Sequence, residues 1–407
     1  AYSYIKTDNP LYRLDKISGR DSSLFDRLPS ATSILATVLD NGNTYHFTEY
    51  QNSHQFNFCY RDLHSKLLKC EISVNLPVRI AHANLYYQRM GRHDVSRQSI
   101  FFEPNIWLRG NAWEIKAKMN SELPDLTTMV NYRDDSNPMN IILGNTQLRN
   151  IHYYDIEGGK TFEGKKHSRL NINTGYHQTD NAVAYSLVFD KQTGVSTVQP
   201  ISVNGNYRID LGIGYTRPLD KKEKLSIDNQ ASFNYNHNVD MAMVQGATQS
   251  QRSIVNNWKI SNVLKLNYRP DDNYEFTLHG GGTYYLIKSQ REGFSNIHAG
   301  DYNIGMNVQI TLPWKLQLTT DLTMFARRGY QLSEMNTTDW IWNAQLSRSF
   351  INKKLLVKLQ GFDILRQLSN TQYLMNAQGR TETWNNSIPR YVMLSLSWRF
   401  NVNPKKK

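Results

Sequence analysis

The sequence predicts an all-β fold: a transmembrane, antiparallel up-and-down β-barrel with about 16 strands in the 407 residues. Three observations carry this prediction. Apolar and polar residues alternate along many segments, most clearly in residues 391–400. Short and long polar connections alternate between those segments. No run approaches the roughly 18 to 20 consecutive apolar residues that a membrane-spanning helix needs, so a helical membrane protein is excluded.

The last alternating segment has two chemically different faces. The apolar face consists of Val392, Leu394, Leu396, Trp398 and Phe400, and the other face of Met393, Ser395, Ser397 and Arg399. In a soluble sandwich the apolar face would meet a second sheet, whereas in an outer-membrane barrel it meets lipid. Alternation alone does not separate these cases. Trp398 and Phe400 favour the membrane, because aromatic residues at the end of an apolar band suit the membrane-water interface. We therefore expect them to mark a terminal strand that takes part in barrel assembly.

Composition favours sheet and turn over helix. Aromatic residues make up 12% of the chain, with 24 tyrosines, and only 39% of the residues are hydrophobic. Such a mixture is expected when half of each strand is polar. The formal net charge is +12, but the basic residues are scattered and do not form a nucleic-acid-binding arm. We expect them to face outer-membrane lipid and lipopolysaccharide, with no nucleic acid as partner.

The connections between strands fall into two alternating classes. The short turns are expected at residues 61–66, 109–111, 163–165, 219–222, 270–273, 312–314 and 351–353. The long loops are expected at residues 89–97, 122–150, 190–194, 240–251, 290–299, 331–337 and 367–388. Short periplasmic turns and longer extracellular loops are typical of outer-membrane barrels. Counting back from Phe400 gives about fifteen strands after Tyr45 and one in the first twenty residues.

No linker divides the chain, so a single barrel domain is predicted over residues 1–407. Residues 1–44 are expected to be partly irregular, with residues 10–42 as a large external loop, and residues 401–407 form a tail. The two cysteines, Cys59 and Cys70, flank a turn. If the neighbouring apolar residues of both strands face the same way, the two side chains point to opposite sides and cannot be bridged. Two free thiols are therefore predicted.

Three motifs carry a resemblance to a known family. They are residues 389–400 at the end, residues 136–149 inside and the segment Gly361 to Gln367. Together they resemble the barrel of TonB-dependent outer-membrane receptors, in the form found in Bacteroidetes. The stretch Gly144 to Asn150 lacks both prolines and the final Glu of the family's mid-barrel motif.

The resemblance implies a protein with a segment that contacts TonB, a globular plug and a barrel of twenty-two strands. The chain contains nothing that looks like the plug or the TonB-contacting segment, so it resembles the C-terminal part of such a barrel. Three possibilities stay open: a part of a longer receptor, a barrel completed by partner protein chains, or a porin-sized barrel that closes alone. TonB would act only through a plug outside these residues.

Aromatic and basic residues near the outer ends of strands are the candidates for ligand contact. They are Arg327, Arg328, Tyr330, Trp340, Trp342 and Trp384. Aromatic faces stack on sugars or siderophores, and arginines grip carboxylates or phosphates. The alternative is an aromatic girdle with lipopolysaccharide contact, which every such barrel is expected to have.

Motifs for other chemistry are weak. Residues 279–282, His-Gly-Gly-Gly, have no nucleophile elbow to accompany them, and residues 133–138 are better explained by an Asx-turn before Pro138 than by a calcium loop. No catalytic, metal or cofactor site is predicted. The leading hypothesis is a nutrient receptor in the outer membrane of a Gram-negative bacterium. The alternatives are a plugless structural or assembly subunit and, more weakly, a soluble all-β binding protein. An enzyme is the least favoured class.

Overall fold

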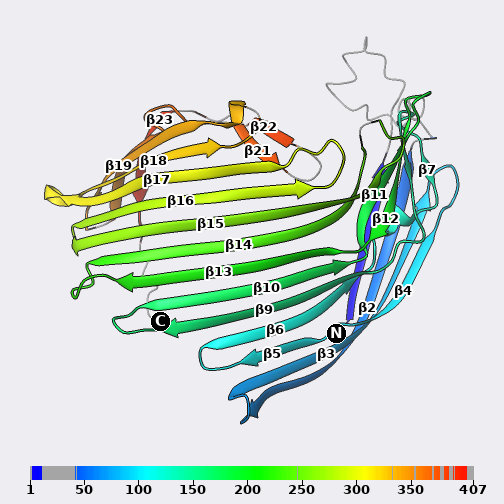
Figure 1. Cartoon of the computed structure of the whole chain (residues 1–407), viewed down its shortest axis with the longest axis horizontal. Coiled ribbons are helices and arrows are strands. Elements are labelled where there is room, and N and C mark those ends of the chain that lie inside the picture. Colours follow the sequence, from blue (N-terminus) through cyan, green and yellow to red (C-terminus); the bar gives the residue numbers. More distant parts are fainter. Residues whose placement is uncertain are drawn as a thin grey trace.

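The structure is a computed structural model of the chain. It describes residues 2–11, 42, 44–244, 246–331, 333–352, 354–368, 371–375, 380–384, 388 and 390–400. Most of these residues belong to one large antiparallel sheet, which is curved (Figure 1).

Seventeen strands make up the large sheet. They are β1 (Tyr2–Leu11), β2 (Tyr45–Ser65), β3 (Cys70–Gln88), β4 (Val95–Phe102), β5 (Asn105–Arg109), β6 (Trp113–Glu122), β9 (Ile151–Glu163), β10 (Arg169–Asp180), β13 (Asn206–Pro218), β14 (Leu225–Ala242), β15 (Gln251–Asp271), β16 (Tyr274–Ser289), β17 (Ile297–Leu312), β18 (Leu316–Arg328), β19 (Thr338–Phe350), β20 (Leu355–Phe362) and β23 (Tyr391–Trp398). Apart from β4 and β5, which both pair with β3, each strand pairs with the next in this order, so the topology is up-and-down.

β4 and β5 together occupy one place in the sheet. Both pair with β3, β4 along Val78 to Leu85 and β5 along Glu71 to Asn75. Glu103 and Pro104 separate them, and Pro104 has no N–H to donate to the ladder. Seventeen strands therefore fill sixteen positions, which confirms the predicted number.

The sheet is not closed. Among the described residues, β1 pairs only with β2, and β23 pairs only with β20, so no ladder joins the two edge strands. The prediction of an antiparallel up-and-down sheet is confirmed, but in the described part of the chain the sheet does not close between these edges.

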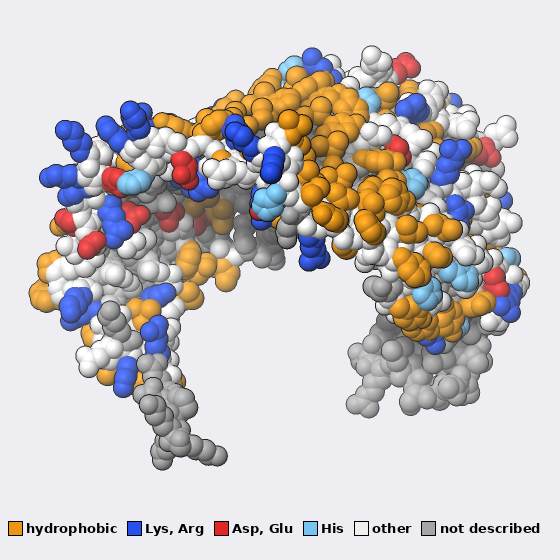
Figure 2. Space-filling model, turned by 90° about the horizontal axis from the view of Figure 1, so that it is seen from below, with side chains coloured by type: hydrophobic (Ala, Val, Ile, Leu, Met, Phe, Trp, Pro, Cys, Tyr) orange, Lys and Arg blue, Asp and Glu red, His pale blue; other side chains and the backbone are white. Residues whose placement is uncertain are grey.

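The two faces of the sheet differ as the alternation predicts. On β17, Tyr302, Ile304 and Met306 are exposed on one face, and the residues between them are polar or glycine. Leu394 and Leu396 of β23 are exposed on the same side of their own strand. Figure 2 shows an arch-shaped molecule with apolar side chains gathered over the outer side of the arch. We call this the outer face and the opposite, polar one the inner face.

Short turns lie at one end of the strands and long connections at the other, at the left and right of Figure 1 respectively. Two boundaries differ from those expected. β2 runs on to Ser65 because an irregularity between Tyr60 and Leu63 shifts its register, so the turn lies at residues 66–69. Residues 190–194 form a tight turn inside a longer excursion between β10 and β13.

The long connections contain structure of their own. A four-stranded sheet is built from β11 (Ala182–Phe189), β12 (Ser196–Val203), β8 (Asn140–Leu143) and β7 (Arg133–Asp134), and β12 pairs with β8 in parallel. A hairpin of β21 (Thr371–Met375) and β22 (Arg380–Trp384) precedes β23. The described helices are single 3-10 turns: η1 (Leu126–Met129), η2 (Pro313–Lys315) and η3 (Ser333–Met335).

Several smaller expectations are settled by local geometry. The amide of Ser136 donates to Asp134 Oδ1 at 3.0 Å, which is the predicted Asx-turn. Cys59 is exposed and Cys70 buried, both as free thiols, in agreement with the parity argument. The predicted external loop at residues 10–42 falls almost wholly outside the described residues, as does the tail at 401–407. None of the described helices is long and apolar enough to cross a membrane.

Candidate functional site at the long-connection end

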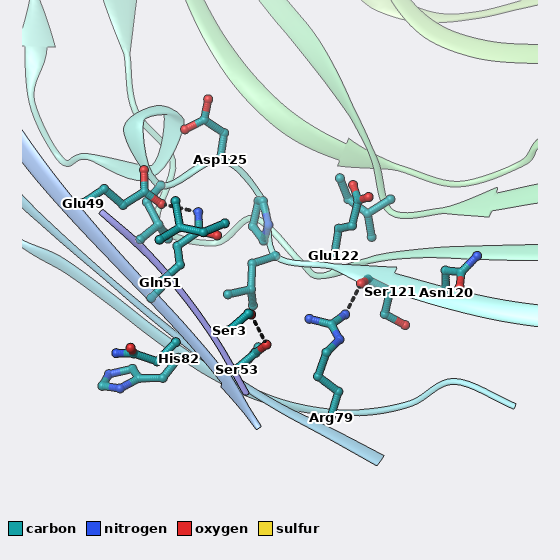
Figure 3. Close-up of a pocket in the computed structure, with 18 of the residues that line it drawn as sticks. Ser3, Glu49, Gln51, Ser53, Arg79, His82, Asn120, Ser121, Glu122 and Asp125 are labelled. Carbon is teal, nitrogen blue, oxygen red and sulfur yellow. Dashed lines mark hydrogen bonds between the residues drawn. The ribbon is translucent and has the colours of Figure 1, made fainter. Parts of the chain in front are cut away.

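A cavity of about 1060 Å³ opens on the inner face, where β1, β2 and β3 approach the end of β6 and η1 (Figure 3). Strand alternation brings Ser3, Gln51, Ser53 and Ala81 to its wall. The chain from Glu122 through η1 forms the opposite side, because it leaves β6 and crosses over the inner face.

The floor of this cavity is a fixed ion pair. Arg79 lies 2.7 Å from Glu103, with its Nε also donating to the same carboxylate at 3.0 Å. The guanidinium also donates to the carbonyl of Ser121 (Figure 3). The backbone amide of Ser121 in turn donates to the carboxylate of Glu103 at 2.9 Å. Phe101 lies beneath the guanidinium, at 4.6 Å from ring centroid to Cζ. Bidentate pairing of this kind holds both groups in one geometry.

Three further carboxylates line the cavity. Glu49 accepts a hydrogen bond from Gln51, Glu122 accepts one from the hydroxyl of Tyr153, and Asp125 caps η1. Within the described part of the chain, none of the three forms an ion pair with a basic side chain. The cavity is therefore acidic in a chain whose net charge is +12, which suits a ligand that presents cations or hydrogen-bond donors.

A charged ladder crosses the inner face at mid-height, over β6, β9, β10 and β13. Asp155 lies 2.5 Å from His177 Nδ1 and 3.4 Å from Lys118. Asp210 lies 3.3 Å from the other ring nitrogen of His177 and 2.6 Å from Arg208. Lys118, Asp155, His177 and Asp210 thus form a continuous line of polar contacts across four strands. Sequence reasoning missed this ladder, because parity places each residue on the inner face but does not give the cross-strand register.

Two of the predicted contact residues meet at one carboxylate. The hydroxyl of Tyr330 donates to Asp301 Oδ1 at 2.8 Å, and Arg327 Nε lies 3.9 Å from the same oxygen. Burial raises the pKa of the Tyr330 phenol, and the hydrogen-bonded carboxylate of Asp301 raises it further. The ring of Tyr330 packs against a buried cluster that includes Ile297 and Ala299. The pair is therefore held in place on the inner face.

The other predicted contact residues lie elsewhere. Arg328 holds its own loop, donating to the carbonyl of Thr337 and the hydroxyl of Thr338, each at 2.7 Å. Trp340 and Trp342 stand opposite Met324 and Leu322 on the outer face, where the aromatic-girdle alternative places them. Trp384 ends β22, and its side chain lies outside the described residues.

The terminal aromatic pair lies at the short-turn end. β23 ends at Trp398, and Phe400 follows with its ring centroid 6.2 Å from that of Trp398. The amide of Arg399 donates to the carbonyl of Lys354 in the neighbouring turn. Trp398 is 46% exposed and Phe400 82% exposed, and their position at a membrane-water interface stays a prediction.

At the long-connection end, a buried arginine ties the loops to the sheet. Arg89 is 1% exposed, lies 2.9 Å from Asp134 and has its guanidinium 4.8 Å from the ring centroid of Tyr132. Its Nε donates to the carbonyl of Gly42. Burial alone would raise the pKa of Asp134, but hydrogen bonds from Ser136 and Arg89 outweigh it and lower that pKa. This ion pair therefore anchors the segment around Asp134 to the chain just after β3.

Comparison with known proteins identifies the outer-membrane character. Residues 248–398 match the model of the outer membrane protein beta-barrel family. The crystal structure of Pseudomonas aeruginosa OccK5 (OpdH) is similar over 87% of this chain and 93% of that chain, at 10% sequence identity and a TM-score of 0.19. No curated protein sequence matches the present chain.

The family match begins just before β15 and ends with β23, so it spans a continuous run of the up-and-down sheet. The described fold is all-β and antiparallel over the same run and beyond it. The protein is thus an outer-membrane protein, built on a multi-stranded sheet of the β-barrel type.

Proposed function

We propose that the chain is the barrel part of a TonB-dependent receptor, which captures a nutrient outside the cell and admits it through a gated lumen. The plug and the TonB contact would come from sequence outside these residues. The observation that carries the proposal is the continuous polar inner face, from the acidic cavity at the long-connection end to the charged ladder at mid-height. A path for a polar solute needs such a lining, since unpaired charge is costly at membrane depth.

The ligand contacts proposed here differ in part from those expected from sequence alone. Arg327 and Tyr330 remain, because both face the inner side and share Asp301. Glu49, Glu122 and Asp125 join them as walls of the large cavity. Trp340 and Trp342 belong to the membrane belt in this proposal.

Nutrient-limited growth tests the energy requirement. We expect a strain that lacks this protein to fail on its nutrient, and a strain with intact protein but inactivated TonB to fail equally. Growth that is independent of TonB would overturn the proposal.

Conductance in planar lipid bilayers separates a receptor from an open pore. A plugged receptor, purified as the native polypeptide, is expected to give no steady ion current. A persistent current in the range of general porins would contradict the proposal, since the lumen would then be open without energy input.

The two edges of the sheet, which have no partner strand among the described residues, favour a second candidate function, a structural or assembly barrel completed by partner chains. In this case β1 and β23 would pair with strands of another protein. The intact mass of the native polypeptide and of its detergent-extracted complex tests this. A stable complex with a stoichiometric partner and a native chain of 47.2 kDa would favour assembly, whereas a longer single chain would favour the receptor.

A further inference from the structure

A second cavity on the molecule has the features of a built ligand site. It measures about 480 Å³ and lies at the long-connection ends of β13, β14 and β15, beside the β11–β12 hairpin. Its volume falls within the range of small-molecule sites. It is separate from the acidic cavity described above, since the two share only Val183 among their lining residues.

Two buried polar atoms in this cavity have no hydrogen-bond partner in the described structure, Ser253 Oγ and Asn257 Oδ1. Ser253 is 6% exposed, so its hydroxyl is almost wholly removed from bulk solvent. Leaving a buried polar group unsatisfied lowers stability, and folded proteins keep few of them. An uncompensated hydroxyl and amide oxygen that face the same cavity therefore point to a ligand that supplies the missing bonds.

The chemistry around these atoms is rich in acceptors. Asp240 stands directly opposite Ser253 in the β14–β15 ladder and also lines the cavity, and its carboxylate accepts a hydrogen bond from the amide of Met241 at 2.7 Å. Directly opposed residues have their Cβ atoms about 4.5 to 5.5 Å apart. The Ser253 hydroxyl and the carboxylate of Asp240 are thus placed to receive one group with several N–H donors. A primary ammonium has three such donors and the charge that a carboxylate favours.

Other residues that line the cavity offer an apolar surface and a basic group. Val239 and Val255 are 3% and 2% exposed and offer an apolar surface for an alkyl group. Arg291, from the loop after β16, lines the cavity with its guanidinium stacked on Phe294 at 5.4 Å from the ring centroid. A guanidinium held in this way suits a carboxylate.

We propose that this cavity binds a zwitterionic amino-acid-type ligand, either a free apolar amino acid or a short peptide. Its ammonium is held by Asp240 and Ser253, which are paired across the β14–β15 ladder, and its carboxylate by Arg291. Asn257 lies about 13 Å further along β15 and accepts a hydrogen bond from another N–H of the ligand. The inference rests on the proposed receptor function and names a ligand class for it.

Isothermal titration of the native polypeptide in detergent, with four probes, tests the ligand class. L-leucine and L-leucylglycine are the two candidate sources, and whichever binds more tightly defines the ligand. For L-leucine, N-acetyl-L-leucine removes the ammonium and L-leucinamide removes the carboxylate. We expect each blocked compound to bind at least 10-fold more weakly than L-leucine. Equal binding of blocked and free compounds, or no heat with either zwitterion, would overturn the proposal.

Variants locate the binding site. Ser253→Ala is expected to lower affinity about 3- to 10-fold while leaving the melting temperature unchanged or raised, since it removes an unsatisfied buried hydroxyl. Asp240→Asn is expected to lower the affinity for L-leucine, which has a free amine, at least 10-fold and to leave the affinity for N-acetyl-L-leucine unchanged. Ser232→Ala is the matched control, because Ser232 lies on the same face of β14 as Asp240 but outside the cavity. A lower melting temperature with unchanged affinity in Ser253→Ala would show a purely structural hydroxyl and overturn the assignment.

The binding test and the growth test address separate hypotheses, so either one can fail without the other. Zwitterion binding without TonB-dependent growth would refute the receptor and leave the site intact. TonB-dependent growth without zwitterion binding would refute the site and leave the receptor intact.

Discussion

The guanidinium of Arg89 is buried at the long-connection end and paired with the carboxylate of Asp134. It is 1% exposed, and it joins β3 to the segment around Asp134. Asp134→Ala leaves this cation without its carboxylate, so we expect the fold around residues 130–149 to lose about 3 kcal/mol. Hydrogen exchange of those amides measures the loss. Arg92→Ala is the control, because its ion pair with Asp94 is exposed and is worth little.

The same pair gives a pH dependence with a defined sign. The pKa of Asp134 is lower in the folded state than in the unfolded chain. Its contribution is therefore complete above the unfolded pKa of about 3.9 and is lost as pH falls through the lower folded value. We expect exchange of residues 130–149 to accelerate below about pH 4, and Asp134→Asn to exchange fast at every pH. Equal acid sensitivity in that variant would contradict the assignment to Asp134.

Two inner-face glycines differ in what surrounds them. A Cβ on Gly305 would lie 2.7 Å from the backbone oxygen of Leu322 and 2.8 Å from the ring of His279. A Cβ on Gly212 would meet nothing within 4 Å. We expect Gly305→Ala to cost about 1 to 3 kcal/mol of unfolding free energy and Gly212→Ala to cost little. Urea unfolding in detergent micelles compares the two, and equal costs would contradict the packing around His279.

At the scale of the strand, the alternation of side chains between the two faces of the sheet predicts opposite effects at neighbouring positions. Leu394 and Ser395 are neighbours on β23, with Leu394 on the lipid side and Ser395 on the inner side. Leu394→Arg is expected to cost about 2 to 4 kcal/mol of folding free energy near mid-membrane, and Ser395→Arg is expected to be tolerated. Folding into lipid vesicles, followed by urea titration, measures both. Equal effects at the two positions would refute the assignment of lipid and inner faces.

Strands were predictable because side-chain alternation is a local property of the sequence. The alternation in residues 225–235, 258–268 and 302–312 lies within β14, β15 and β17 as expected. The parallel pairing of β12 with β8 was not predictable, because it joins segments about fifty residues apart with no repeated pattern between them. The meeting of Tyr330 with Asp301 depends in the same way on cross-strand register. The alternation therefore predicts which face of the sheet each residue lies on, but not which residues meet across neighbouring strands.

At the scale of the whole molecule, charge is arranged along the strand axis. Lysines occupy the short turns, among them Lys165, Lys166, Lys221 and Lys222, and Figure 2 shows Lys and Arg side chains gathered at the left end of the arch. His167 Nδ1 and Glu223 Oε1, 2.6 Å apart, join two of these turns. Each lysine near an anionic surface is worth about 1 kcal/mol.

Replacing these four lysines by glutamine should therefore lower the fraction of phosphatidylglycerol that co-purifies with the protein. Mass spectrometry of the bound lipid measures the ratio of phosphatidylglycerol to phosphatidylethanolamine. The wild-type ratio should fall toward that of the variant in high salt, because salt screens exposed charges. A ratio that depends on neither change would contradict a lipid role for this end.

The small sheet of β7, β8, β11 and β12 draws on two separate long connections, and the segment after β14 joins it through the bridge from Val188 to Gln249. Its parallel ladder cannot form until the transmembrane hairpins have brought these connections together. We therefore expect it to be the last part of the chain to assemble. These loops should consequently become resistant to protease added from outside the cell only after the protein has finished inserting. The time at which this resistance appears would therefore report the final step of its biogenesis.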